Sequence, residues 1–166
     1  KTLKDGRLMS NAIFSKYPII SSQTHDLSKE ENRNAVQADI DVNGKILHVF
    51  STHLLHTHQT PQAIQDEQIE TLIKSIPTEN SLVMGDFNAT PDSTVIQKMK
   101  IKMQSNTDNI PTLNPNLFDC KICDPATVPH TRLDYIFNTP DLNVSNFTVE
   151  QSAGSDHYAI STQLEL

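Results

Sequence analysis

The chain has 166 residues, a length that suits one domain with its own hydrophobic core, and we expect residues 1–166 to form a single domain. Its 13 basic and 20 acidic side chains give a formal net charge of −7, which argues against a broad electrostatic grip on nucleic acid. Hydrophobic residues make up 36% of the chain and no apolar run approaches a bilayer's thickness, so we expect a soluble protein with no transmembrane segment. The sequence starts at Lys1 and leaves open whether the protein is cytoplasmic or secreted.

The first third of the chain predicts strands around one tight hairpin. Residues 8–20 predict a strand that a proline ends, and the polar residues 21–34 predict a loop. Residues 36–42 alternate between apolar and polar side chains, which indicates a strand with one solvent-exposed face. Asn43-Gly44 is typical of a two-residue hairpin turn, so residues 46–54 should form the returning strand.

Two helices are predicted in the middle of the chain. Thr60 and Pro61 are suited to the N-cap and the first position of a helix that Pro77 ends. Its expected buried stripe consists of Ile69, Leu72, Ile73 and Ile76. After the apolar strand at residues 82–84, Ser93 is placed to begin a second, short helix.

The remainder predicts a long excursion and two further strands. Residues 104–130 are polar and rich in proline, which indicates a surface excursion of the kind that often carries function. Residues 132–137 and 158–166 predict strands, with a variable segment between them. Cys120 and Cys123 lie in the excursion; we interpret them as loop thiols, with a metal or redox role as the alternative.

Polar side chains with catalytic potential follow the apolar segments. Asp86 and Asn88 come after the strand at 82–84, and their spacing of two places both on one side of an extended chain. The corresponding positions at the other segment ends are His53, Asp134, Asp156 and His157. Each has an ordinary structural explanation alone, but a shared sheet edge would bring them into one cleft.

The combined set suits the hydrolysis of a phosphoester. Carboxylates hold a hard divalent cation through oxygen, and such a cation neutralises phosphate charge. A further carboxylate can activate water, and imidazoles can donate to phosphoryl oxygens as charge develops. A zinc site at His53, His56 and His58 is disfavoured because no His-Glu-x-x-His helix is present, and the sequence has no Gly-x-Ser-x-Gly elbow.

The ordered motifs resemble the endonuclease/exonuclease/phosphatase superfamily. They are Ser-Asn-Ala-Ile-Phe-Ser-Lys-Tyr-Pro-Ile (10–19), Ser-Thr-His-Leu (51–54), Gly-Asp-Phe-Asn-Ala-Thr-Pro-Asp-Ser (85–93), Arg-Leu-Asp-Tyr-Ile-Phe (132–137) and Ser-Asp-His (155–157). Arg33 also lies where many members carry an arginine. The resemblance implies an α/β fold, a four-layer sandwich of two mixed β-sheets flanked by helices.

The resemblance further implies hydrolysis that depends on Mg²⁺ or Mn²⁺. Asp86 would orient or deprotonate the attacking water beside Asn88, and Asp156 would help to hold the metal. His157, oriented by Asp134, would contact the phosphate, and His53 would supply a second imidazole. The substrate would be a phosphodiester or phosphomonoester of a nucleic acid, a lipid headgroup or a small molecule.

One expected element is absent from this sequence. Members carry a metal-binding glutamate in an early strand, and no glutamate here precedes residues 10–19. We therefore expect the chain to be the C-terminal two-thirds of such a domain and to be weak or inactive alone. The alternative is a catalytically inactive binding or regulatory module that keeps the fold.

Overall fold

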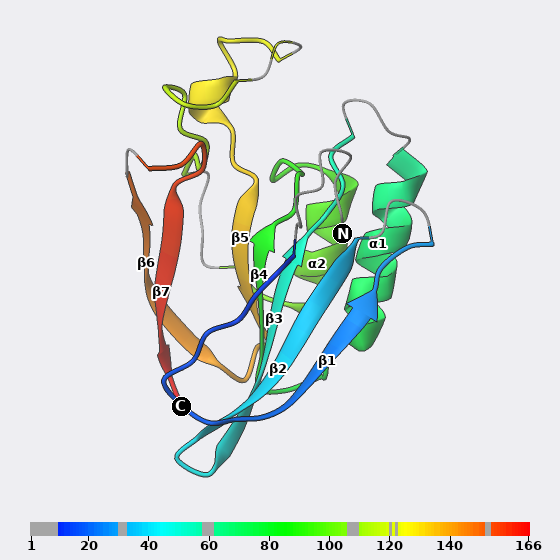
Figure 1. The fold of residues 1–166 in the computed structure, drawn as a ribbon, viewed down its shortest axis with the longest axis vertical. Coiled ribbons are helices and arrows are strands. Elements are labelled where there is room, and N and C mark those ends of the chain that lie inside the picture. The colour runs from blue at the N-terminus through cyan, green and yellow to red at the C-terminus, as the bar shows by residue number, and fades with distance from the viewer. Residues whose placement is uncertain are drawn as a thin grey trace.

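The computed structural model describes residues 10–29, 33–57, 62–105, 110–119, 121, 123–151 and 154–166. Most of the described strands form one sheet in the order β1-β2-β3-β4-β5 (Figure 1). The strands are β1 (Ile19–Asp26), β2 (Asn34–Val42), β3 (Lys45–His53), β4 (Ser81–Asp86) and β5 (Asp134–Asn138). Only the β3–β4 pair is parallel within this sheet, so the sheet is mixed.

The predicted hairpin is confirmed. β2 and β3 pair antiparallel, and the turn residues Asn43 and Gly44 have φ angles of 56° and 90°. Positive φ at both central residues is what a type I′ turn requires, and such a turn matches the twist of the strands that flank it.

The prediction for the first strand is wrong. The structure has no strand in residues 10–18; β1 begins at Ile19, so it shares only residues 19–20 with the predicted strand and continues into the predicted loop at 21–34. Most β1 side chains are exposed, so the segment shows none of the apolar alternation that identifies a half-buried strand. Pairing with β2 stabilises it, and Ser21 adds a hydrogen bond of 2.6 Å from its Oγ to Asp39 Oδ2.

Both predicted helices are present and cover one face of the sheet (Figure 1). They are α1 (Gln62–Ser75) and α2 (Thr94–Lys102). Ile69 and Leu72 are fully buried, as the helical spacing predicts, and Ser93 caps α2 by accepting a hydrogen bond from the Ile96 amide. The predicted start of the first helix, Thr60 and Pro61, lies outside the described residues.

A second, smaller sheet lies on the opposite face of the main sheet (Figure 1). It pairs β6 (Asn143–Glu150) antiparallel with β7 (Ala159–Glu165). The last strand was predicted, but β6 falls in the segment that the sequence left unassigned. The mixed α/β fold with two sheets is thus confirmed; in the described residues the second sheet contributes two antiparallel strands and the helices cover the main sheet alone.

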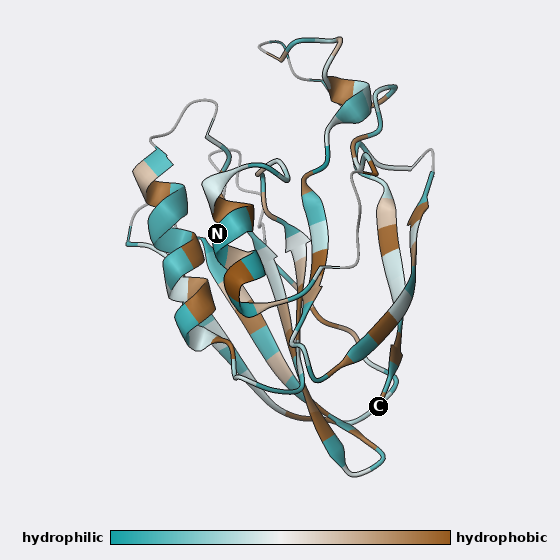
Figure 2. Cartoon of the chain, turned by 180° about the vertical axis from the view of Figure 1, so that it is seen from behind, coloured by the Kyte–Doolittle hydropathy of each residue, from teal (hydrophilic) through white to brown (hydrophobic). Residues whose placement is uncertain are grey.

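Apolar side chains fill both faces of the main sheet. Figure 2 shows how hydrophobic and hydrophilic residues alternate along the chain. Phe50, Val83 and Phe137 pack toward the helices, and Ile40 and Val49 pack toward the small sheet. Within the described residues, no helix is long and apolar enough to cross a membrane.

The excursion at residues 104–130 has little regular structure, as predicted. Its one described helix is the 3₁₀ helix Val128–His130. Cys123 is disulfide-bonded, so the interpretation of the cysteines as free loop thiols is wrong. The other cysteine in the sequence, Cys120, lies outside the described residues.

Gly85 allows β4 to lie close to β3. Its φ is +143°, and a Cβ built at this position would lie 1.9 Å from the Thr52 carbonyl oxygen. The clash involves backbone, which cannot rotate away, so any larger residue would force the two strands apart.

We predict that Gly85→Ala lowers the free energy of unfolding by at least ~2 kcal/mol, because it adds both a backbone clash and an unfavourable φ. Urea denaturation followed by circular dichroism measures this change. Gly154→Ala is the control, since a Cβ at Gly154 meets nothing within 4 Å and the residue has no positive φ. Equal stability of the two variants would contradict the prediction.

Candidate functional site

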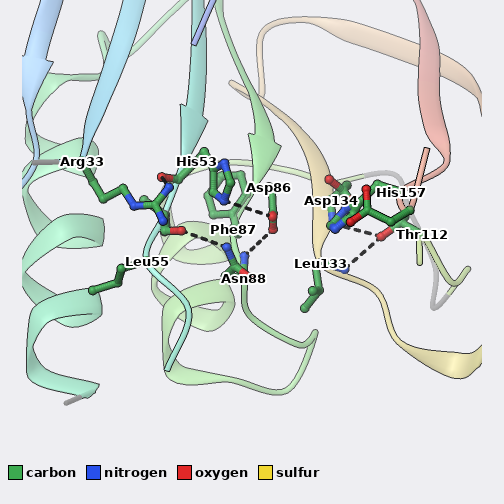
Figure 3. A network of polar contacts seen from close by, with 12 residues as sticks. Arg33, His53, Leu55, Asp86, Phe87, Asn88, Thr112, Leu133, Asp134 and His157 are labelled. Carbon is green, nitrogen blue, oxygen red and sulfur yellow. Dashed lines mark hydrogen bonds and ion pairs between the residues drawn. The ribbon is translucent and has the colours of Figure 1, made fainter. Parts of the chain in front are cut away.

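Three of the predicted side chains lie in one row across the sheet edge (Figure 3). The parallel register of β3 and β4 pairs His53 with Asp86, and the antiparallel register of β4 and β5 pairs Asp86 with Asp134. Because β4 ends where β5 begins, residues that are 48 and 33 positions apart in sequence become cross-strand neighbours.

The turn after β4 holds Asp86 and Asn88 together. The Asn88 amide N–H donates to Asp86 Oδ1 at 2.7 Å, and the Asn88 side-chain Nδ2 donates to the Leu54 carbonyl oxygen at 2.9 Å. Asn88 has a φ of 48°, a left-handed conformation that asparagine tolerates better than most residues. Its amide group therefore ties the end of β4 to the chain that leaves β3.

Gln65 of α1 reinforces this turn. Its Nε2 donates to the carbonyl oxygens of Leu55, Phe87 and Asn88 at 2.8, 3.2 and 3.0 Å. The Gln65 side chain is 2% exposed, and its burial is compensated by these hydrogen bonds. The sequence did not single out this residue, because a glutamine on a helix ordinarily faces water.

His157 and Asp134 form a hydrogen-bonded pair. The distance from His157 Nδ1 to Asp134 Oδ2 is 2.8 Å (Figure 3). With Asp134 ionised, the Nδ1–H donates to the carboxylate and the ring's Nε2 is left for another partner. The resemblance implied this orienting role for Asp134, and the geometry is compatible with it.

Two residues of the excursion position this pair, and neither was predicted. Thr112 is buried, and its hydroxyl oxygen accepts hydrogen bonds from the amides of Leu133 and Asp134 at 3.0 and 3.2 Å. The backbone carbonyl oxygen of Thr112 accepts from the Tyr158 amide at 2.7 Å. Leu113 forms a β-bridge with His157. The only signal in the sequence was a short Thr-Leu-Asn stretch between prolines.

Asp156 is placed differently from the other predicted residues. It is exposed, its backbone carbonyl oxygen accepts from the Asn114 amide at 2.8 Å, and its Oδ1 accepts from the Ser155 hydroxyl at 3.3 Å. Its carboxylate is not part of the cluster formed by the other acidic residues. Its predicted role as a metal ligand therefore stays a prediction.

Burial, together with the charge of the adjacent Asp134, raises the pKa of Asp86 to about 7. The hydrogen bond from the Asn88 amide acts in the opposite direction without cancelling these effects. A carboxyl group with a pKa near 7 can exchange a proton at physiological pH, as a general base must.

The pKa values of the two histidines of the site are shifted in opposite directions. Burial lowers the pKa of His53 to about 4, aided by the Arg33 guanidinium, whose Nη1 donates to the His53 carbonyl oxygen at 3.4 Å. The hydrogen bond to Asp134 raises the pKa of His157. At neutral pH His53 is thus uncharged, and its 3.5 Å contact with Asp86 is not an ion pair.

Asp86, Asp134 and His157 could share a metal ion. One potential ligand atom from each lies within 4.8 Å of the others. Two neighbouring carboxylates in a poorly solvated position repel each other, and a divalent cation relieves that repulsion. The donor set therefore fits a hard cation. His56 is outside this group, and His58, part of the disfavoured zinc hypothesis, lies outside the described residues.

Comparison with protein families identifies one match, to the model of the Endonuclease/Exonuclease/phosphatase family over residues 6–157. The search of curated proteins finds no match.

Solved structures share the fold at low sequence identity. An endonuclease/exonuclease/phosphatase from Bacteroides vulgatus superimposes with a TM-score of 0.74 at 20% identity, covering 91% of this chain and 67% of that one. Mannosyl-6-phosphatase of Bacteroides thetaiotaomicron gives 0.65 at 15% identity, covering 91% and 68%. Staphylococcus aureus beta toxin with bound magnesium ions gives 0.55 at 22% identity, covering 89% and 65%. The chain spans about two thirds of each of these structures.

We predict that Asp86→Asn stabilises the metal-free chain at alkaline pH. The folded-state pKa of Asp86 lies above its ordinary value of 3.8, so its contribution to stability is fully present below pH 3.8 and is lost as pH rises toward 7. In EDTA at pH 8 the free energy of unfolding of the variant should exceed that of the wild-type chain by on the order of 2–4 kcal/mol, and the difference should be smaller at pH 5.

Denaturation curves at both pH values test this prediction. Asp119→Asn is the matched control, because Asp119 is exposed and has no described role in the site. A gain that is the same at pH 5 and pH 8 would show that something other than charge burial produces it.

Proposed function

Because the chain belongs to the endonuclease/exonuclease/phosphatase family, we propose that it is a metal-dependent phosphoesterase that hydrolyses its substrate by attack of an activated water. The observation that carries the proposal is the row of Asp86 and the Asp134–His157 pair along one sheet edge. This arrangement offers a proton acceptor and a hydrogen-bond donor within a short distance of each other, as hydrolysis of a phosphoester requires.

Asp86 acts on the attacking water. Its pKa of about 7 makes it a stronger base than an ordinary carboxylate, and its hydrogen bond from Asn88 fixes one oxygen while the other remains available. Asn88 keeps the turn in place rather than reacting.

The two imidazoles have different tasks. His157 holds its proton more tightly than a free histidine, so it donates to a phosphoryl oxygen as negative charge builds there. His53 stays neutral and offers a hydrogen bond without adding charge beside Asp86. Environments that push the pKa values of neighbouring groups apart are typical of acid–base sites.

Mg²⁺ or Mn²⁺ is the proposed cofactor. Asp134 offers a carboxylate oxygen for it beside Asp86, and Asp156 is the further candidate ligand that the family resemblance implied. When bound, the ion would neutralise phosphate charge and polarise the scissile bond. The magnesium ions in beta toxin support this assignment by analogy of fold.

We predict that hydrolysis of a generic phosphodiester requires the divalent ion and Asp86. EDTA should abolish turnover and added Mg²⁺ should restore it, while Asp86→Asn should lower kcat by ~10²–10⁴-fold because the water loses its proton acceptor. Steady-state assays on the full-length protein measure both effects, with Asp119→Asn as the control. Turnover that is unaffected by EDTA would refute metal dependence.

The 166-residue chain alone should be less active than a form that includes the family's early metal-binding glutamate. A cation bound by fewer carboxylates is held more weakly, so we expect the chain to bind Mg²⁺ poorly and the extended form to bind it well. Isothermal titration calorimetry with MgCl₂ on both forms makes the comparison. Equal affinity and equal turnover would disprove this expectation. Binding of substrate without turnover in the extended form would favour an inactive binding module.

A further inference from the structure

A cavity of about 520 Å³ lies next to the chain segments that carry the catalytic side chains. Its wall includes Asn88, two residues after Asp86, and Leu133, which precedes Asp134. It also includes Leu113, which pairs with His157. Asp86, Asp134 and His157 do not line the cavity themselves, but each is one or two positions from, or paired with, a residue of its wall. The volume lies in the range of small-molecule sites.

The polar part of the wall is uncharged with one exception. Five hydroxyl groups line it, from Thr57, Thr90, Ser93, Thr127 and Thr131. Three side-chain amides join them, from Gln62, Gln65 and Asn88. Among the lining residues that the structure describes there is no lysine, arginine or histidine, and the single charged side chain is Asp124.

This wall is poorly suited to a polyanion. Proteins hold nucleic-acid backbones with lysine and arginine, and the negative charge of Asp124 would repel a second phosphate. A chain with a formal net charge of −7 offers no long-range compensation. The cavity therefore disfavours nucleotides and nucleic acids on the leaving-group side of the scissile bond.

The apolar part of the wall connects the cavity to the catalytic histidine. The ring centroids of Phe118 and His157 are 6.2 Å apart in an edge-to-face arrangement, so Phe118 both packs near His157 and lines the cavity. Phe118 is the one aromatic side chain in the described lining. A cage for a quaternary ammonium group uses several aromatic faces, so a choline-like group fits this wall less well than a neutral one does.

We propose that this cavity is the leaving-group pocket and that it selects an uncharged polyhydroxyl group, such as the sugar of a sugar phosphate. The inference rests on the proposed phosphoesterase function and deepens it by naming the substrate class. The hydroxyl groups of the wall exchange hydrogen bonds with sugar hydroxyls, and Phe118 and Leu133 contact the apolar C–H faces of a sugar ring.

The reaction balances as a simple hydrolysis. The water oxygen bonds to phosphorus, the bond from phosphorus to the sugar oxygen breaks, and Asp86 takes the water's proton. The sugar oxygen gains a proton from solvent, so the products are the free sugar and inorganic phosphate.

The test compares three phosphoesters with the full-length protein and Mg²⁺. The probes are glucose 6-phosphate, phosphocholine and the 5′-phosphorylated dinucleotide pdTpdT, which place in the cavity a neutral group, a cationic group and a nucleotide that carries a second phosphate. We expect kcat/KM for glucose 6-phosphate to exceed that for either of the others at least tenfold. A dinucleotide preference would overturn the inference.

Two variants assign the preference to the cavity. Val128→Trp fills part of it and should raise KM for glucose 6-phosphate at least tenfold. Asp124→Lys changes an exposed residue, so it carries little risk to folding, and it should shift the ratio of kcat/KM toward the dinucleotide at least tenfold. Lys100→Trp, on the exposed side of α2, is the control and should change neither value. Variants of the cavity that behave like Lys100→Trp would overturn the inference.

A binding measurement separates this inference from the proposed function. Calorimetric titration of glucose 6-phosphate into Asp86→Asn, with and without Val128→Trp, reports on the cavity even where no probe is hydrolysed. Binding that Val128→Trp weakens tenfold supports the pocket on its own, whereas unchanged binding refutes it. Absence of hydrolysis of all three probes by the wild-type protein counts against the phosphoesterase function alone.

Discussion

The site depends on the close approach of β4 to β3 and β5. Gly85 lets the two parallel strands lie so near that a Cβ would meet the Thr52 carbonyl oxygen at 1.9 Å. In the register of these strands, His53, Asp86 and Asp134 are neighbours. Two carboxylates are thereby held side by side with little water, and the pKa of Asp86 rises to about 7 as a consequence.

Placing two carboxylates side by side is unfavourable for folding because they repel each other, but it is useful for catalysis. The fold maintains it through the fully buried side chains beneath the site, including Phe87 and Phe137, whose rings pack edge to face at 5.2 Å. Gln65 and Thr112 hold the two chain segments that carry the reactive groups. Ordinary core packing and buried polar side chains with satisfied hydrogen bonds thus offset the repulsion between the two carboxylates.

The excursion at residues 104–130 serves the site from two sides. The Thr112 carbonyl oxygen and the Leu113 bridge anchor the segment that bears His157, and Phe118, Asp124 and Val128 form part of the wall of the neighbouring cavity. A segment with almost no regular structure therefore links the catalytic pair to the proposed leaving-group pocket. The same segment would then contribute both to substrate selection and to the position of the Asp134–His157 pair, so substitutions in it should affect both.

The sequence by itself determined the elements with a strong local pattern. The alternation in β2, the Asn-Gly turn, the helical stripe of α1 and the Ser93 cap need only neighbouring residues, and all are seen in the structure. The order of motifs was also enough to indicate the family and to select His53, Asp86, Asn88, Asp134 and His157 as candidates. Tertiary structure alone decided the rest. β1 owes its strand form to pairing with β2, Gln65 and Thr112 gained their roles through partners more than 20 residues away, and Asp156 was left outside the acidic cluster. Those outcomes rest on which segments meet in space and which groups lose their water, and neither is encoded in a local pattern.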